Sequence, residues 1–386
     1  MSAEADQQSG RFGAESAADL HKLRPMEAVA ALYAADDAGV AAALVASLGK
    51  AIFEEPVPKP TNALRTALAG VTYRVVKQTT TREGTTYRNR LLEQSGHPYA
   101  QALLASSRPE TQALVEGGDP MNAPYMMIAP EIRRNIALWD NLFFNSVQSQ
   151  DVQLRFIWET RTTHELAKMR LAKGHPVHLK ALAGGTGLSM ILAYDRLVRE
   201  GSDPAMVTCR ITDRDTANTA KTNRLLAKLA ALRGWKIGAR GQPGISAHTE
   251  DIFAGAVAGE AYDVVTVVGI LEYLQGHTCE TTERRQGLPE TPDAKTALHL
   301  AEKLKQMTAG DASVIVNSYK PHPSIRILEM FGKRYDYRTR GDVDAVLAAG
   351  GFRAVRTVGS AHIYDVMVYG RIPRRRAEGG HALGLV

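Results

Sequence analysis

Short apolar segments alternate with amphipathic ones along the second half of this chain. The apolar segments have the length and aliphatic content of buried strands, and they lie at 177–183, 206–212, 235–239, 262–269, 312–317, 352–358 and 363–369. Helical periodicity is found between them, at 188–199, 218–232, 294–307 and 342–349. A strand, a helix and a second strand of these lengths fold as a right-handed crossover onto a parallel sheet. We therefore predict an α/β fold with a mostly parallel, seven-stranded sheet and helices on both faces.

The residues before this alternation have a different pattern. Residues 1–17 are polar and without periodicity, as in a disordered tail. Helical patterns then occur at 25–35, 39–52, 62–68, 88–94, 99–104 and 111–115, with a stiff proline-rich break at 56–60. We expect an α-helical extension or lid over 18–151 and an α/β domain over 152–372. The last residues, 373–386, are expected to be a flexible basic tail.

The composition argues against several classes of protein. No apolar stretch reaches the roughly 18 to 20 residues of a membrane span, and the polar N-terminus is unlike a signal peptide. The two cysteines, Cys209 and Cys279, lie far apart and are not part of a metal-binding spacing pattern, which predicts no disulfide, no metal site and a cytoplasmic location. The net charge of +6 comes from 47 basic and 41 acidic side chains that alternate along the chain. We therefore expect neither nucleic acid nor membrane as a partner.

The first predicted strand ends in a glycine-rich turn. Glycines there let the backbone bend sharply and approach a ligand closely, and the turn contains Ala183, Gly184, Gly185 and Gly187. Met190 stands where a dinucleotide fingerprint has its third glycine, and no Gly-Lys-Ser/Thr follows, so the phosphates of NAD or ATP are not expected here. The turn suits an adenosine ligand without phosphates. A plain strand-to-helix connection is the structural alternative.

The second predicted strand ends in acidic residues. Asp213 follows this strand directly, where a carboxylate can accept hydrogen bonds from both hydroxyls of a ribose. Its neighbour Arg214 is a further candidate for contact with a cofactor. Asp215 is expected to cap the helix that begins near Thr216.

At this point the chain resembles the class I S-adenosylmethionine-dependent methyltransferases, whose fold is Rossmann-like. The similarity covers about residues 152–371 and lies in five segments in the same order, 181–187, 213, 248–253, 262–274 and 343–352. The resemblance implies S-adenosyl-L-methionine as the cofactor. Ala181 and Ala183 depart from the family's acid-x-Gly-x-Gly-x-Gly loop, so another group must hold the ammonium of the cofactor.

The resemblance also implies roles for residues further along the chain. An acid with an apolar neighbour after the third strand contacts adenine in that family, which points to Glu250, Asp251 and Ile252. The turn after the fourth strand lies below the methionine moiety, which points to Gly269. Glu272, or a carboxylate from the N-terminal region, is then a candidate for binding the cofactor's ammonium group.

Methyl transfer from a sulfonium mainly requires in-line alignment of the acceptor with the methyl carbon. Tyr273 is a candidate for a cation–π contact with the sulfur, and His277 for a general base. Core packing of the tyrosine and simple solvation of the histidine are the alternatives. The helical extension is expected to build the acceptor pocket, with candidate substrate contacts at Tyr125, Gln148, Asp151 and Arg155.

The predicted function is SN2 methyl transfer from S-adenosyl-L-methionine to a small molecule, in specialised metabolism by analogy of fold. One alternative is attack on the aminobutyryl carbon, by aminocarboxypropyl transfer or by cyclisation to azetidine-2-carboxylate, with release of methylthioadenosine. A catalytically inactive cofactor-binding partner subunit is a second alternative. A homodimer is compatible with the sequence, which does not identify the acceptor.

Overall fold

The computed structural model describes residues 20–33, 38–60, 122–134, 144, 147–239, 241–253, 261–274, 297–322 and 335–372. Within them, a seven-stranded sheet has the order β3-β2-β1-β4-β5-β7-β6. The strands are β1 (Val177–Ala181), β2 (Val207–Asp213), β3 (Gly244–Thr249), β4 (Tyr262–Val267), β5 (Thr308–Asn317), β6 (Phe352–Ser360) and β7 (Asp365–Arg371). Neighbouring strands are parallel, except that β7 runs antiparallel to both β5 and β6. The predicted Rossmann-like α/β fold is confirmed.

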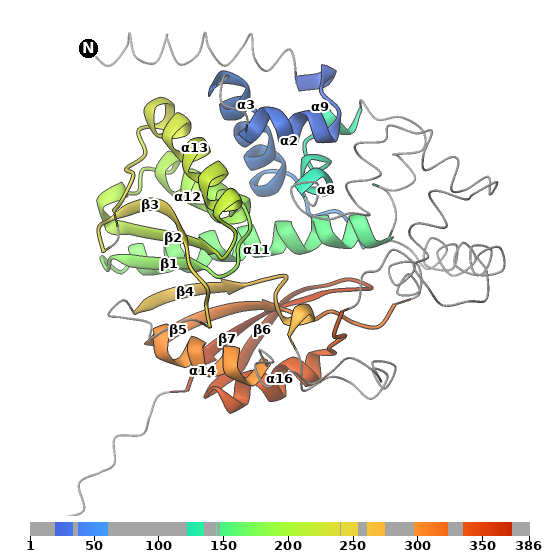
Figure 1. Ribbon diagram of the computed structural model, residues 1–386, viewed down its shortest axis with the longest axis vertical. Helices are drawn as coiled ribbons and strands as arrows, with labels where there is room; N and C mark the ends of the chain where they lie inside the picture. The colour runs from blue at the N-terminus through green and yellow to red at the C-terminus, as the bar shows by residue number, and fades with distance from the viewer. Residues whose placement is uncertain are drawn as a thin grey trace, which may run out of the picture.

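Helices cover both faces of this sheet (Figure 1). One face carries α11 (Val147–Leu171), α12 (Leu188–Arg199) and α13 (Thr216–Arg233), and the other carries α14 (Ala297–Met307) and α16 (Arg340–Ala349). Successive side chains of a strand point to opposite faces, so Val264 and Val265 of β4 belong to two different hydrophobic clusters. Burial on both faces explains the nearly continuous apolar sequence of this strand.

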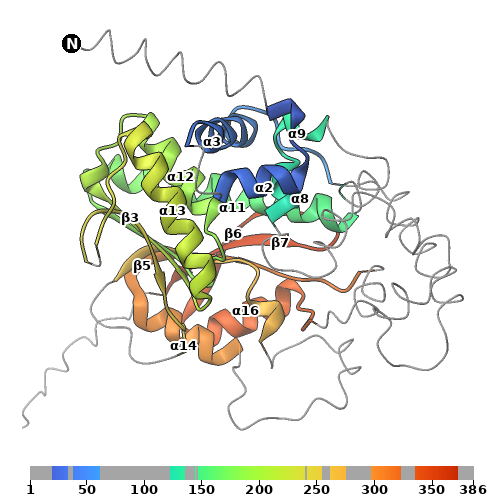
Figure 2. The ribbon, with the colours of Figure 1, turned by 45° about the horizontal axis from the view of Figure 1, so that its top comes forward.

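A second layer of helices lies outside α11, α12 and α13 (Figure 2). It contains η1 (Leu20–Lys22), α2 (Pro25–Tyr33), α3 (Ala38–Phe53), α8 (Ala123–Met126) and α9 (Pro130–Arg133). The buried side chains of α2 and α3 belong to the same hydrophobic cluster as those of α11 and α12. The predicted helices at 25–35 and 39–52 are therefore present. The predicted tails at 1–17 and 373–386, and the helical patterns between 62 and 115, lie outside the described residues.

The third strand differs from the prediction. It spans Gly244–Thr249, whereas the expected strand at 235–239 forms only an isolated bridge, between Ile237 and Ile245. The reason lies in Arg210, which is buried in β2 and donates hydrogen bonds to the carbonyl oxygens of Ala239 and Gln242. These bonds curl the segment into a loop, and the chain joins the sheet after it.

The helix that precedes the sheet crosses the expected boundary between the extension and the α/β domain. α11 runs without a break from Val147 to Leu171, so the expected boundary between 151 and 152 falls inside its first two turns. Most of its first half is buried, and polar side chains are among the buried ones. The helix therefore belongs to both layers, and the domain limits stay a prediction.

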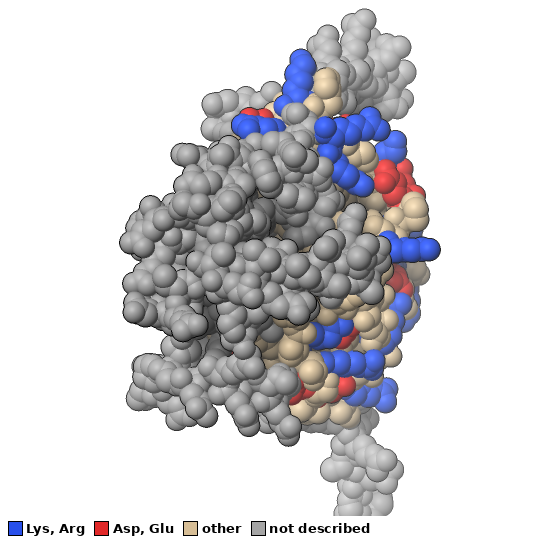
Figure 3. Space-filling view, turned by 90° about the vertical axis from the view of Figure 1, so that its right-hand side faces the viewer, with Lys and Arg blue, Asp and Glu red and all other residues tan. Residues whose placement is uncertain are grey.

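The surface agrees with the mixed charge pattern of the sequence. On the face seen in Figure 3, described basic side chains lie next to acidic ones. Among the residues that the structure describes, no helix combines the length and the apolar character needed to cross a bilayer.

Candidate functional site

The sheet order places the site at the carboxyl ends of β1, β2 and β4. From β1 the chain continues outward to β2 and β3, and then returns to β4 on the other side of β1. Ligands of open α/β sheets bind at such a switch point. The residues that come together there are those of the turn after β1, Asp213 at the end of β2, and Gly269 just after β4.

Left-handed backbone conformations shape the turn after β1. Ala183, Gly185 and Gly187 have φ angles of 44°, 57° and 64°. A Cβ atom on Gly187 would lie 2.5 Å from the Ile211 side chain, so the turn packs tightly against β2. A Cβ on Gly185 would meet nothing within 4 Å. The open side of the turn is therefore at Gly185, while Ala183 adopts a conformation that is costly for a residue with a side chain.

The N-terminal helices contact this turn directly. The Tyr33 hydroxyl of α2 donates a 2.6 Å hydrogen bond to Thr186, and Thr186 donates one of 3.3 Å to Asn122. Both Tyr33 and Thr186 are buried. The helical extension thus fixes the turn from outside, as well as covering α11.

Asp213 is held firmly at the end of β2. Its carboxylate accepts hydrogen bonds of 2.8 Å from the backbone N–H groups of Gly185 and Asp215. Oδ1 also accepts a 3.5 Å hydrogen bond from the Asn218 side chain, so the acceptor position that remains open is on Oδ2, since an ionised carboxylate has about four such positions. Asp215 caps α13 by accepting a 2.8 Å hydrogen bond from Ala217 N–H, as expected.

The acidic residues that were predicted to contact adenine form other hydrogen bonds in this structure. The Glu250 carboxylate accepts a 2.8 Å hydrogen bond from Lys180, a nearly fully buried side chain of β1. Asp251 accepts one of 2.9 Å from Phe253 N–H in a local turn. Ile252 is buried in the hydrophobic cluster beneath the sheet, and Arg214 is exposed. Their proposed roles in cofactor binding stay predictions.

Beyond β4, a buried ion pair lies beside a glycine. Gly269 has a φ of 81°, and its N–H donates a 2.7 Å hydrogen bond to the Asn317 side chain. A Cβ there would lie 3.6 Å from the guanidinium of Arg155, which comes from α11. Arg155 contacts the carboxylate of Glu272 at 3.4 Å and the hydroxyl of Tyr125 at 3.4 Å. Three of the predicted site residues, from separate parts of the chain, are thus in contact.

A cluster of tyrosines surrounds this ion pair. Tyr319 and Tyr364 stack with centroids 5.1 Å apart, and Tyr335 packs edge-on against Tyr319 at 5.3 Å. The guanidinium of Arg155 lies 4.5 Å above the ring of Tyr364. Tyr273, proposed to face the sulfur, is 62% exposed and contacts Tyr335 at the rim of the cluster. His277 lies outside the described residues.

One face of α11 carries a polar stripe toward the site. Gln148, Asp151, Arg155 and Glu159 follow one another at helical spacing on this face. Gln148 donates a 3.5 Å hydrogen bond to Tyr319, and Asp151 accepts one of 2.6 Å from Ile363 N–H. Within the described ranges, no three His, Cys, Asp or Glu side chains gather as metal ligands.

Glu159 gives the site a titratable group that the sequence did not single out. Its carboxyl accepts a 2.9 Å hydrogen bond from Ser189, and burial raises its pKa to about 7. In an unfolded chain the pKa of glutamate is about 4.3, so the folded protein retains a proton that the unfolded chain releases between these values. The free energy of unfolding should therefore decrease, by about 3 kcal/mol, as the pH rises through this window.

Glu159→Gln is expected to remove this pH-dependent part of the free energy of unfolding. Urea unfolding of both proteins at about pH 5 and about pH 8 measures it, because Asp151, whose pKa is raised to about 6 by burial, contributes equally to both. If the free energy of unfolding changed equally with pH in the wild type and the variant, Glu159 would be ionised in the folded protein over this whole pH range.

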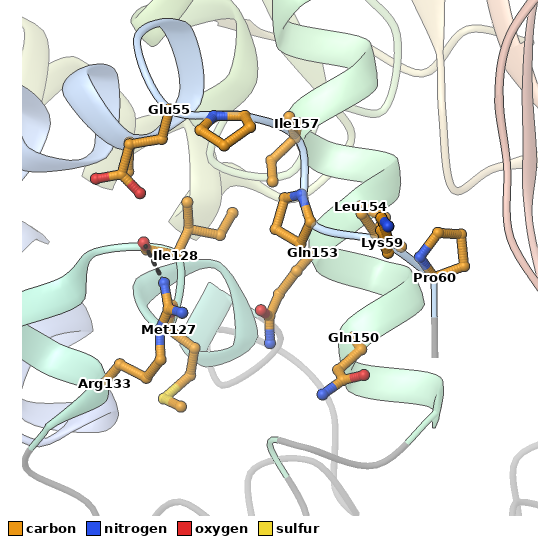
Figure 4. A pocket seen from close by; sticks show the side chains of 13 residues that line it. Glu55, Lys59, Pro60, Met127, Ile128, Arg133, Gln150, Gln153, Leu154 and Ile157 are labelled. Carbon is orange, nitrogen blue, oxygen red and sulfur yellow. Dashed lines mark hydrogen bonds between the residues drawn. The ribbon is translucent and has the colours of Figure 1, made fainter. Parts of the chain in front are cut away.

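A cavity of about 450 Å³ lies on the other side of α11 (Figure 4). Gln150, Gln153, Leu154 and Ile157 line it from this helix, and the proline-rich segment after α3 closes it from the opposite side. These positions alternate with those of the polar stripe, so the cavity and the site are separated by the width of the helix.

The sequence missed several residues at this site. Tyr319 follows β5 directly after Asn317 and Ser318, and this polar run at a strand end was a readable signal. Glu159 lies one helical turn after Arg155, so the stripe itself predicts it. Tyr335 and Tyr364 carry no such signal, because loops bring them to the site.

Comparisons with known proteins find only distant likenesses. No protein-family model and no curated protein matches the sequence. A possible exported protein from Bordetella parapertussis is similar at 14% identity over 80% of this chain and 97% of that chain, with a TM-score of 0.47. Magnesium protoporphyrin IX methyltransferase from Synechocystis matches at 16% identity over 57% and 87% of the two chains, with a TM-score of 0.36. The pyocyanin biosynthetic protein PhzM matches at 18% identity over 71% of each chain, with a TM-score of 0.38.

Proposed function

We propose that this protein is an S-adenosyl-L-methionine-dependent methyltransferase that acts on a small molecule. The observation that carries the proposal is the open backbone at Gly185 next to a buried carboxylate, Asp213, at the switch point of the sheet. The antiparallel position of β7 between β5 and β6 agrees with the resemblance of the sequence to class I methyltransferases.

The residues around the turn fit a nucleoside that lacks phosphates. No described atom lies within 4 Å of the position that a Cβ would take on Gly185, so a ligand can approach the backbone there. Residues 182–187 contain no lysine or arginine to neutralise a phosphate.

When bound, the cofactor supplies an electrophilic methyl carbon. The protein's part is to bind and to orient. Asp213 would accept a hydrogen bond from the ribose, and Gly269 would let the chain pass close to the methionine end below β4. Arg155 and Glu272 fix charge at the end of the site next to the acceptor, and the tyrosine cluster excludes water around it. Alignment of this kind can lower the activation free energy by about 7 to 11 kcal/mol.

Attack on the aminobutyryl carbon is the second candidate. Ala181 stands at the end of β1 as a buried apolar residue, so the usual carboxylate is absent from the methionine end. If other residues bind the methionine end of the cofactor, its aminobutyryl chain would be open to attack by a nucleophile. The two reactions leave different nucleosides, S-adenosylhomocysteine for methyl transfer and methylthioadenosine for the alternative.

Calorimetry with S-adenosyl-L-methionine, followed by mass spectrometry of the nucleosides, tests the proposal. We expect one molecule to bind per chain, and S-adenosylhomocysteine to accumulate when an acceptor is supplied. Methylthioadenosine formed without any acceptor would favour cyclisation instead. Absence of binding would reject both enzymatic functions.

A further inference from the structure

The polar stripe of α11 and its surroundings contain more hydrogen-bond acceptors than donors. Among the described residues of this region, three buried carboxylate or amide oxygens have no hydrogen-bond partner, Glu272 Oε2, Asp151 Oδ1 and Gln148 Oε1, and the donor Arg155 Nε has none either. The buried guanidinium of Arg338 also lies near Glu272. Glu272 and Asp151 are 4% and 0% exposed, so water does not satisfy them. A buried carboxylate oxygen without a partner is costly, which makes these atoms a site for a ligand that donates hydrogen bonds.

The charges of the same region favour a cation. The acidic groups among the described residues there are Glu272, Asp151, Glu159, Asp336 and Asp365, and the basic ones are Arg155, Arg338 and Lys320. Lys320 is already bound to Asp365 at 2.8 Å, and Arg155 reaches Glu272 only at the long distance of 3.4 Å. The acidic groups therefore outnumber the basic ones by two, although burial raises the pKa of Glu272, Asp151 and Glu159.

The tyrosines already bind one cation in this region. Arg155 lies over the face of Tyr364, and Tyr335 and Tyr273 extend the aromatic surface to the exposed rim. Aromatic faces attract ammonium groups by about 0.5 to 2 kcal/mol. A carboxylate or phosphate ligand would instead face Glu272 and Asp151 and be repelled.

We propose that the acceptor is a small molecule with a primary or secondary amine, which donates hydrogen bonds to Glu272 and its neighbouring acceptor oxygens. This inference rests on the proposed function. An alcohol has one donor for three buried acceptors, whereas a primary ammonium has three. The amine is also the nucleophile that the methyl group requires.

The transfer balances as follows for a primary amine. The ammonium first releases one proton to the carboxylate of Glu272, which holds it until the products leave and the site opens to solvent. The nitrogen lone pair then forms the bond to the methyl carbon, while the electron pair of the breaking C–S bond stays on sulfur. Nitrogen takes the positive charge, and the sulfonium becomes the neutral thioether S-adenosylhomocysteine.

Matched amines and alcohols test the inference on the full chain. With S-adenosylhomocysteine present, calorimetry measures the binding of butylamine, benzylamine and 2-phenylethylamine against the alcohols of the same skeletons. We expect an amine to bind at least about tenfold more tightly than its alcohol, as for hydrogen bonds to charged groups. With S-adenosyl-L-methionine, mass spectrometry should show the N-methyl product of that amine.

Glu272→Gln keeps the shape of the side chain and removes its charge, and it should reduce the preference for the amine about tenfold or more. Glu165→Gln is the control, because this glutamate lies on α11 outside the polar stripe, is exposed and is bound to Arg356. Asp151→Asn replaces Glu272→Gln if that variant does not bind S-adenosylhomocysteine. Equal binding of all amines and alcohols would overturn the inference and leave the proposed function standing. Failure of the wild type to bind S-adenosylhomocysteine would reject the proposed function itself.

Discussion

Gly187→Ala is expected to lower the free energy of unfolding by about 2 to 5 kcal/mol. A side chain at a φ of 64° costs about 1 to 2 kcal/mol. The new Cβ would also lie 2.5 Å from Ile211, and overpacking of a dense core typically costs about 1 to 3 kcal/mol more. Urea unfolding followed by circular dichroism measures the loss.

Gly185→Ala is the matched control for this effect. Its φ of 57° is equally left-handed, but its Cβ would meet nothing within 4 Å. We expect a loss of about 1 kcal/mol in stability and a weaker affinity for S-adenosyl-L-methionine, because the methyl group enters the space that the ligand would use. Equal losses of stability at both positions would contradict the close packing of the turn on β2.

Asp213→Asn is expected to weaken the binding of S-adenosyl-L-methionine by about 10- to 150-fold. The amide retains one acceptor oxygen but loses the charge, and hydrogen bonds to charged groups contribute about 1.5 to 3 kcal/mol. Calorimetry on the purified variant gives the change in Kd. Unfolding in urea shows how much of the loss comes from the backbone N–H groups of Gly185 and Asp215 that the carboxylate also binds.

Asp215→Asn controls for a change of charge at the same strand end. Asparagine caps helices about as well as aspartate, so stability should change little. Affinity for the cofactor should also remain within about twofold of wild type, since the Asp215 carboxylate binds Ala217 N–H rather than facing the turn. An effect on affinity equal to that of Asp213→Asn would mean that net charge alone, and not a ribose contact, is responsible.

Local patterns were sufficient to predict the fold. The strand at 262–267 is apolar throughout because both of its faces are covered, and α16 begins at Arg340 behind a Thr339–Asp342 capping box that the sequence also contains. The third strand was misplaced because its position depends on Arg210, a charged residue in a buried strand whose bonds to loop carbonyls have no local signature. Tertiary contacts, and not propensity, decide such a segment.

The site was only partly predictable for the same reason. Asp213 and the glycine turn follow their strands directly, so the topology places them. Tyr125, Arg155 and Glu272 were chosen separately, and the structure brings them into contact. The stacking of Tyr364 on Tyr319 could not be foreseen, because 44 intervening residues, which include α16 and β6, separate them, and only the folded sheet sets their distance.

The position of α11 between two layers has a consequence for folding. Its buried side chains pack toward the sheet on one side and toward α3 and α8 on the other, so neither layer can bury its apolar surface alone. The two halves of the chain should therefore melt together as a single cooperative unit, with coincident transitions by near-UV and far-UV signals. A fragment that lacks the N-terminal helices would keep the strands but expose the apolar side chains of α11 that pack against α3 and α8. We expect such a fragment to aggregate.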